Sequence, residues 1–344
     1  MKKKTRYNVA VVGVGAVGIE MLRVLRQRSF PVGELRVFAR SARDIEVDRD
    51  KISVRPVSAE GFEGVDIALF AGTEGEKGAS ISYASEAVKR GSVVIDNGAD
   101  FRMDPKVPLV VPEVNASDIK KHKGIIANPN CSTIQMVVAL WPIYKKAGIR
   151  RIIVTTLQAS SGAGRQAVEQ LKEETAIISS RGFSSLHIKT ENMAMPQQLG
   201  FNVFPHIGSF SECDYTNEEW KLVRETHKIM HDNKIRISAT TVRVPVRTGH
   251  SESVYIETGK QITPEKVRGI LSKAPGIVVL DDPKNNLYPM PKDVEGRDET
   301  FVGRIRSDCF VKNGLWLWVV ADNLRKGAAT NAVQIAECVI SSWK

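Results

Sequence analysis

Residues 7–28 constrain the fold of this chain more than any other segment. A short β-rich run, residues 7–12, leads directly into Gly13-Val14-Gly15-Ala16-Val17-Gly18. The apolar spacing after this loop predicts a helix over residues 19–28. Strand, G-x-G-x-x-G and helix in this order form the dinucleotide fingerprint, whose glycines admit a pyrophosphate to the helix N-terminus. A tight βα turn without a ligand is the alternative. We assign to a nucleotide cofactor Gly13, Gly15, Ala16, Val17 and Gly18.

The same alternation of strand and helix continues through the first part of the chain. We predict strands at residues 35–39, 65–70 and 92–95, and a helix at residues 80–89. Repeated βα units predict a Rossmann-type, doubly wound parallel sheet. The loop Ala71-Gly72-Thr73 follows a buried strand, and we expect Gly72 to face the cofactor.

The end of the second predicted strand bears on the choice of cofactor. NAD-binding sites usually carry Asp or Glu there, whereas this chain has Arg40-Ser41-Ala42-Arg43. Guanidinium groups suit a 2′-phosphate because they donate two parallel hydrogen bonds. We therefore predict NADP, with Arg40 and Ser41 in contact with it. The alternative is an exposed loop whose arginines face water.

A second motif, residues 126–133, places a cysteine at the start of a helix. An Asn-Pro-Asn turn precedes Cys131, and the apolar residues after it are spaced as on one helix face: Ile134, Val137, Val138 and Trp141. A thiol in a first helical turn feels the positive end of the helix dipole, which favours the thiolate. This position predicts a nucleophile. The alternative is a small packing residue, since free cysteine is among the most buried residue types.

Length and composition indicate a two-domain globular chain. At 344 residues it is too long for one typical core. The net charge of +10 comes from dispersed basic residues without an aromatic-basic motif, so we do not predict nucleic-acid binding. Attraction of small anionic substrates, or a solvated basic surface, accounts for it. No apolar run reaches membrane-span length and no signal sequence is evident, so we predict no membrane partner and a cytoplasmic location with reduced thiols.

The second half of the chain predicts a mixed sheet. Strands are expected at residues 151–158, 237–246, 277–280 and 315–320, and helices at 217–231 and 264–272. We predict domains of residues 1–130, completed by a C-terminal helix within 323–344, and of residues 131–322. His227 and His231 are four residues apart, but without a third ligand we favour an exposed helix face and predict no metal. Arg102, beyond a strand's carboxyl end, would bind an anion or be solvated.

Together these motifs resemble the aspartate-β-semialdehyde dehydrogenase family. The resemblance is carried in chain order, over nearly the whole sequence, by residues 128–133, 158–164, 201–207, 218–221, 243–250, 322–328 and 331–334. It implies the reversible, NADP-dependent reductive dephosphorylation of aspartyl phosphate to aspartate semialdehyde, the branch point toward lysine, methionine and threonine. It also implies an α+β catalytic and dimerisation domain, and a homodimer.

The resemblance also implies roles for individual residues. The nucleophile, the acid/base and the residue that positions the acyl intermediate would be Cys131, His250 and Gln158. The substrate α-carboxylate and amino group would meet Arg243 and Glu218, and the phosphate would meet Arg102, Asn130 and Lys221. Further cofactor contacts would come from Ser161, Gly162, Asn323 and Gln334.

Two departures and two rival interpretations accompany the resemblance. The glycine loop is one residue shorter than the family's G-x-T-G-x-x-G, and the loop before Phe101 lacks the expected serines. N-acetyl-γ-glutamyl-phosphate reductase shares the thioester route, but we expect a glycine and an aromatic residue beside its cysteine, where this chain has Asn130 and Ser132. A catalytically silent binding protein would have lost the nucleophile or the acid/base, and both residue types are present.

Overall fold

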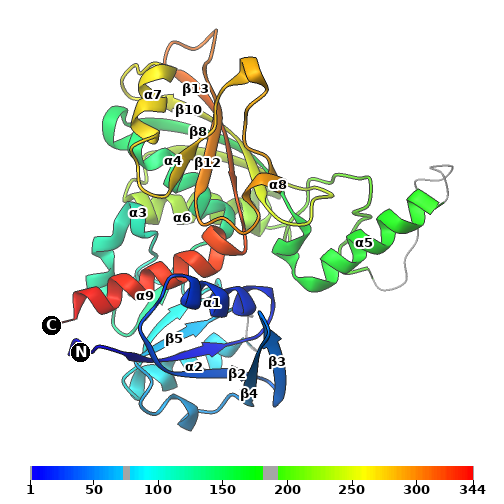
Figure 1. Ribbon diagram of the computed structural model, residues 1–344. Coiled ribbons are helices and arrows are strands. Elements are labelled where there is room, and N and C mark those ends of the chain that lie inside the picture. The colour runs from blue at the N-terminus through cyan, green and yellow to red at the C-terminus, as the bar shows by residue number, and fades with distance from the viewer. Residues whose placement is uncertain (1, 73–77, 181–192, 344) are drawn as a thin grey trace. The chain divides into compact units, whose positions relative to one another are not determined.

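The computed structural model describes residues 2–72, 78–180 and 193–343, which form two compact units (Figure 1). Unit 1 consists of Met1–Asn130, Lys228–Met230 and Gly327–Lys344, and unit 2 of Cys131–His227 and His231–Lys326. Residues 323–326, which the sequence suggested for the first domain, therefore lie in unit 2. There Asn323 hydrogen-bonds Ser161. Over the described ranges, every helix is too short or too polar to cross a membrane.

Unit 1 is built on a sheet that has seven strands among the described residues, in the order β3-β4-β2-β1-β5-β6-β7. Its neighbours pair in parallel except for β3 with β4, which confirms the predicted doubly wound parallel sheet. The β3–β4 hairpin was not predicted, although its apolar residues alternate with polar ones: Ile45 and Val47 in β3, and Ile52 and Val54 in β4. The strands are β1 (Tyr7–Val12), β2 (Val32–Ala39), β3 (Arg43–Val47), β4 (Asp50–Pro56), β5 (Ile67–Phe70), β6 (Val93–Asp96) and β7 (Ile125–Ala127).

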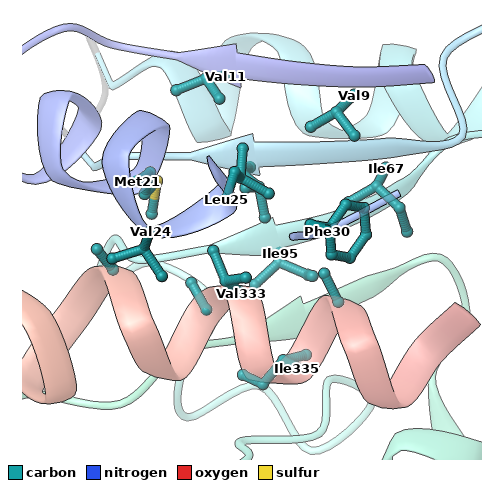
Figure 2. Packing of buried hydrophobic residues seen from close by; sticks show 14 of the residues in the cluster. Val9, Val11, Met21, Val24, Leu25, Phe30, Ile67, Ile95, Val333 and Ile335 are labelled. Atoms are coloured by element: carbon teal, nitrogen blue, oxygen red, sulfur yellow. The ribbon is translucent and has the colours of Figure 1, made fainter. Parts of the chain in front are cut away.

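Helices cover both faces of the sheet of unit 1: α1 and α9 share a core on one face, and α2 packs on the other. α1 begins earlier than predicted, because Gly15 caps it in an extended conformation and brings Ala16 to Gly18 into its first turn. The last helix of the chain returns to this unit, where Val333 and Ile335 share a cluster with Leu25 of α1 and Ile95 of β6 (Figure 2). The helices are α1 (Ala16–Gln27), α2 (Ala79–Lys89), α3 (Pro112–Asn115) and α9 (Thr330–Ser342).

Unit 2 is built on a mixed sheet, as predicted, with six strands among the described residues in the order β11-β12-β13-β10-β8-β9. β8 with β9 and β11 with β12 are parallel, and the other neighbours are antiparallel. The strands are β8 (Ile149–Gln158), β9 (Arg236–Arg243), β10 (His250–Thr258), β11 (Ile277–Val279), β12 (Thr300–Ser307) and β13 (Gly314–Ala321).

The predicted helix after the Asn-Pro-Asn turn is confirmed: it begins at Cys131 and packs against β10 and β13. A reciprocal capping box between Thr216 and Glu219 starts the helix that carries Glu218. The helices of unit 2 are α4 (Cys131–Ala147), α5 (Arg165–Ser180), α6 (Asn217–Met230), α7 (Pro264–Leu271) and α8 (Pro291–Val294), with the end of α6 counted in unit 1.

One strand boundary in unit 2 was predicted wrongly: β9 ends at Arg243, which pairs with the last residue of β8, rather than at residue 246. A nine-residue strand that begins at His250 was not predicted. The helix expected to reach residue 231 ends at Met230, and His231 caps it in the left-handed conformation, with φ of 55°.

The turn between β1 and α1 depends on two glycines for different reasons. Gly13 has a φ of +101°, which side-chain-bearing residues rarely adopt. A Cβ on Gly18 would lie 1.9 Å from the carbonyl oxygen of Gly13. Among the described residues, no heavy atom lies within 4 Å of the Cβ position of Gly15. Gly18 therefore serves the packing of the turn, whereas the described part of the chain leaves the space beside Gly15 open.

We expect Gly18→Ala to lower the free energy of unfolding by about 2 kcal/mol or more, because the added methyl group overlaps backbone that cannot move freely. Gly15→Ala is the matched control and should leave stability within roughly 0.5 kcal/mol of the wild type. Urea unfolding followed by circular dichroism measures both. Equal losses for the two variants would contradict this division of roles.

Candidate active site

Three strand ends of unit 2 present polar side chains on one buried face. Gln158 of β8 pairs in register with Arg243 of β9, and Leu157 pairs with Ser251 of β10. Residues alternate between the faces of a sheet, so His250 lies on the same face as Gln158 and Arg243. All three side chains are almost wholly buried. The register therefore gathers an amide, a guanidinium and an imidazole.

The first turn of α4 joins this group. Gln158 donates through Nε2 to the Ser132 hydroxyl oxygen at 2.9 Å. Cys131, the residue before, is partly exposed and belongs to the same first turn. Its sulfur acts electrostatically on the Arg243 guanidinium. The predicted nucleophile thus stands beside the predicted acyl-positioning residue and the predicted carboxylate clamp.

Arg243 is held as a buried cation. Its Nη1 donates to the carbonyl oxygen of Ala159 at 2.6 Å, while its Nε has no hydrogen-bond partner among the described residues. Burial lowers the pKa of the guanidinium, and the nearby Glu218 and Cys131 oppose that shift. Glu218 accepts from Gln158 at 3.3 Å and pairs with Lys221 at 3.3 Å. The structure brings these predicted substrate-binding residues together within unit 2.

The imidazole of His250 has a defined tautomer. Its Nδ1 accepts a hydrogen bond from the backbone N–H of Ala159 at 3.0 Å, so the proton of the neutral ring is on Nε2. That Nε2–H has no partner among the described residues. A Cβ on Gly162 would lie 3.0 Å from Nε2 and 3.5 Å from Arg243 Nη1. Both polar groups therefore border the same small space, which glycine keeps open.

His250 is neutral at working pH. Burial, assisted by the Arg243 cation and opposed by Glu218, lowers its pKa to about 3. The ring is therefore uncharged in the pH range in which an ordinary histidine titrates. With Nδ1 occupied as an acceptor, the ring acts through Nε2–H as a hydrogen-bond donor.

Asn323 and Ser161 hold the turn that precedes His250. The Asn323 Oδ1 accepts from the backbone N–H of Gly249 at 3.0 Å, and its amide exchanges hydrogen bonds with Ser161. The resemblance assigned both side chains to the cofactor. In unit 2 they also connect the loop after β8 to the start of β10.

Arg102 in unit 1 is buried rather than solvated. Its Nε donates to the carbonyl oxygen of Asn128 at 2.9 Å, and its Nη2 donates to that of Asn97 at 2.7 Å. These carbonyls follow the carboxyl ends of β7 and β6. Asn130, the second predicted phosphate ligand of this unit, is also buried. The alternative of a solvated arginine is therefore wrong.

The nucleotide loop of unit 1 fits a dinucleotide. Ala16 and Val17 contribute to the first turn of α1, and the space above Gly15 is open to a phosphate. Gly72, with a φ of +79°, brings its backbone against residues 97 and 98 at the end of β6. Thr73 of the same predicted loop lies outside the described residues.

The remaining predicted cofactor contacts of unit 1 differ in exposure. Arg40 and Ser41 are exposed after β2, and Arg43 donates to the Ser41 hydroxyl oxygen at 3.5 Å. No carboxylate replaces them at the strand end. Gln334 of α9 donates to Glu113 of α3 at 3.0 Å.

Two polar groups beside the site were missed by sequence reasoning. Gln135 lies one turn after Cys131 on α4, and Glu252 lies two residues after His250 on β10. Both are fully buried. The sequence signal for them would have been a glutamate, Glu252, at a position of β10 that faces the core. Recognising that position requires the register of the strand.

Comparison with known proteins places the whole chain in one group. The family "Semialdehyde dehydrogenase, NAD binding domain" matches residues 8–122, and "Semialdehyde dehydrogenase, dimerisation domain" matches residues 140–326. The aspartate-semialdehyde dehydrogenase of Aquifex aeolicus is 53% identical over 97% of this chain and 98% of its own length. That of Bacillus subtilis is 49% identical over 96% of each.

A solved structure extends the likeness to three dimensions. The chain is similar to aspartate semialdehyde dehydrogenase II of Vibrio cholerae, whose crystal structure is described as complexed with ASA. The TM-score is 0.92 and the identity 43%, over 99% of this chain and all of the other.

The buried imidazole predicts a specific loss of stability in acid. The unfolded chain binds a proton at His250 below pH 6.5, whereas the folded chain binds one only near pH 3. Stability should therefore fall as the pH drops through this window, by up to roughly 1.4 kcal/mol per pH unit from this residue.

In His250→Asn this contribution is absent, so the difference in unfolding free energy between pH 7 and pH 4.5 should be smaller than in the wild type. Urea titrations at both pH values measure it. An identical acid loss in both proteins would show that His250 titrates normally in the folded state.

Proposed function

The chain belongs to the aspartate-semialdehyde dehydrogenase family, and from this premise we propose that it catalyses the reversible, NADP-dependent conversion of L-aspartyl-4-phosphate to L-aspartate-4-semialdehyde and phosphate. The reaction supplies lysine, methionine and threonine synthesis. The observation that carries the proposal is the convergence of Gln158, Arg243 and His250 beside the first turn of the Cys131 helix. No comparable observation favours either alternative, an N-acetyl-γ-glutamyl-phosphate reductase or a catalytically silent binding protein.

The first step forms a thioester. The Cys131 thiolate attacks the acyl carbon, the bond from that carbon to the phosphate oxygen breaks, and phosphate departs. The Arg243 guanidinium grips the substrate α-carboxylate and Glu218 meets the amino group, which orients the acyl carbon toward the sulfur. Gln158 steadies the acyl group from the end of β8.

The second step is the reduction, for which a nicotinamide, when bound, would supply the hydride. The carbonyl oxygen becomes an oxyanion, and His250 Nε2–H donates a hydrogen bond to it. Collapse breaks the carbon–sulfur bond, releases the aldehyde and restores the thiolate. Because the sulfur begins and ends as thiolate, a neutral imidazole suffices here, and the proton of the overall reaction is taken up by the released phosphate.

Phosphate binding would combine cationic and amide donors. We assign it to Arg102, Asn130 and Lys221. The buried setting of Arg102 supports this role, because its backbone partners hold the guanidinium in one orientation. Lys221 pairs with Glu218, so a phosphate would compete with that carboxylate for the ammonium group.

NADP is the cofactor that the cofactor-domain residues favour. The pyrophosphate would lie against Gly13, Gly15 and the first turn of α1, and the 2′-phosphate against Arg40 and Ser41. We further assign cofactor contacts to Gly72, Ser161, Gly162, Asn323 and Gln334.

A homodimer is proposed from the sheet of unit 2. Its second face, opposite His250, carries half-buried apolar side chains that include Ile153, Leu157 and Trp318. A second copy would cover this face, in keeping with the dimerisation-domain family that residues 140–326 match. The cytoplasmic location expected from the sequence stays a prediction.

The assay that tests the function is phosphate-dependent reduction of NADP with aspartate semialdehyde, beside the acetylated glutamate analogue. Wild-type enzyme should prefer aspartate semialdehyde, and Cys131→Ser should lower kcat by about a thousandfold or more, since a serine hydroxyl is a far weaker nucleophile here. Thermal melting and NADP binding of the variant serve as controls. A folded Cys131→Ser enzyme with near wild-type turnover would contradict the assignment of Cys131 as the nucleophile.

For the cofactor, we expect Arg40→Ala to raise the KM for NADP by about tenfold or more while changing that for NAD little, because the lost ion pair involves only the 2′-phosphate. Steady-state kinetics with each cofactor decide this. A wild type that prefers NAD would contradict it.

For the assembly, light scattering at micromolar concentration should give twice the chain mass of 38.0 kDa. Trp318→Glu, which places a charge on the apolar face, should shift the protein toward monomer. A wild-type monomer at this concentration would refute the dimer.

A further inference from the structure

Glu252 is a buried carboxyl group that the proposed mechanism does not use. Its side chain has no exposed surface, and neither carboxyl oxygen has a hydrogen-bond partner among the described residues. In register it is flanked by Thr156 of β8 and Val319 of β13, and it forms no ion pair within the described ranges. A carboxylate in such surroundings would be very costly, so the group is held as the neutral acid. Burial raises its pKa well above the usual carboxyl range.

A neutral carboxyl group has one O–H to donate, and the acceptor beside it is Gln135. The Gln135 side chain, on α4, is a polar group within reach of Glu252. One of the two N–H groups of its Nε2 donates to the backbone carbonyl oxygen of His250 at 3.4 Å. Its Oε1 is buried and has no donor among the described residues. The unmatched donor of Glu252 and the unmatched acceptor of Gln135 are therefore complementary.

The two groups connect the elements that carry the chemistry. Gln135 lies one helical turn after Cys131, and Glu252 lies two residues after His250 on the same face of β10. We propose that Glu252 is a positioning residue, which donates to Gln135 and thereby ties the nucleophile's helix α4 to the start of the His250 strand. The inference rests on the proposed function for its kinetic consequence, but the link itself does not.

Variants at position 252 test whether the residue acts as a neutral hydrogen-bond donor or as a negative charge. Glu252→Gln keeps size and a donor, so it should retain kcat within roughly threefold of the wild type. Glu252→Met removes the donor at similar volume and should lower kcat by about tenfold or more, because small displacements of reacting groups are costly. KM for aspartate semialdehyde should change less than twofold, since Arg243 and Glu218 lie on other elements. Val254→Ala, a buried change on the same strand, is the control for general destabilisation and should leave kcat unchanged.

Gln135→Met removes the same link from the side of the helix. It should lower kcat at least as much as Glu252→Met, because it also removes the hydrogen bond to the His250 carbonyl oxygen, and the double variant should be no worse than Gln135→Met. If Glu252→Met does not fold, Gln135→Met takes its place. Urea unfolding of the wild type, the two single variants and the double variant tests the contact without substrate. If the two side chains interact, the double variant should lose less unfolding free energy than the sum of the losses in the single variants.

The outcomes are distinct. A wild-type protein that is inactive with aspartate semialdehyde would refute the proposed function. The unfolding measurements alone would then test the contact between Glu252 and Gln135. Activity in the wild type with an unchanged kcat in folded Glu252→Met would overturn the positioning role. Equal losses in Glu252→Gln and Glu252→Met would overturn the neutral donor, and strictly additive stability losses would overturn the contact with Gln135.

Discussion

The register that pairs β8 with β9 and β10 is the constraint on which the rest of the site depends. It sets Gln158 opposite Arg243 and turns His250 to the same face. A slip of one residue would send any of these side chains to the half-exposed face. The slip is opposed by the apolar residues that follow on β10, where Val254 and Ile256 are fully buried. The polar site is thus located by the hydrophobic core beneath it.

Polar side chains on a buried face need hydrogen-bond partners, and here the backbone of one residue, Ala159, bonds two of them. The backbone N–H of Ala159 donates to the His250 imidazole, and its carbonyl oxygen accepts from the Arg243 guanidinium. Both side chains are thereby oriented by the loop that follows β8. The imidazole Nε2 and the guanidinium Nε are both fully buried and have no hydrogen-bond partner among the described residues. These donors are directed by the scaffold and left available to a substrate.

The parts of this structure that the sequence foretold are those with local signals. Glycine spacing predicted the nucleotide turn, and the apolar spacing after Cys131 predicted α4. The strand that begins at His250 was not predicted, because the turn-forming residues Thr248 and Gly249 directly precede it. The neutrality of His250 and the burial of Arg102 depend on groups far away in sequence, so no local pattern predicts them. Glu252 shows the same limit, since its meaning depends on which face of β10 is covered.

The charges of the site follow from having one buried cation. A guanidinium keeps its proton in proteins, so Arg243 is charged whatever its surroundings. A protonated His250 beside it would place a second cation on the same buried face, and both charges would have to be desolvated. The imidazole therefore stays neutral. In the reaction proposed for this chain, the fixed cation would hold a carboxylate that is present throughout, whereas the neutral N–H donor would gain most from an oxyanion that exists only after hydride transfer. The proposal therefore assigns binding and rate acceleration to different residues, because only the interaction that strengthens in the transition state lowers the barrier.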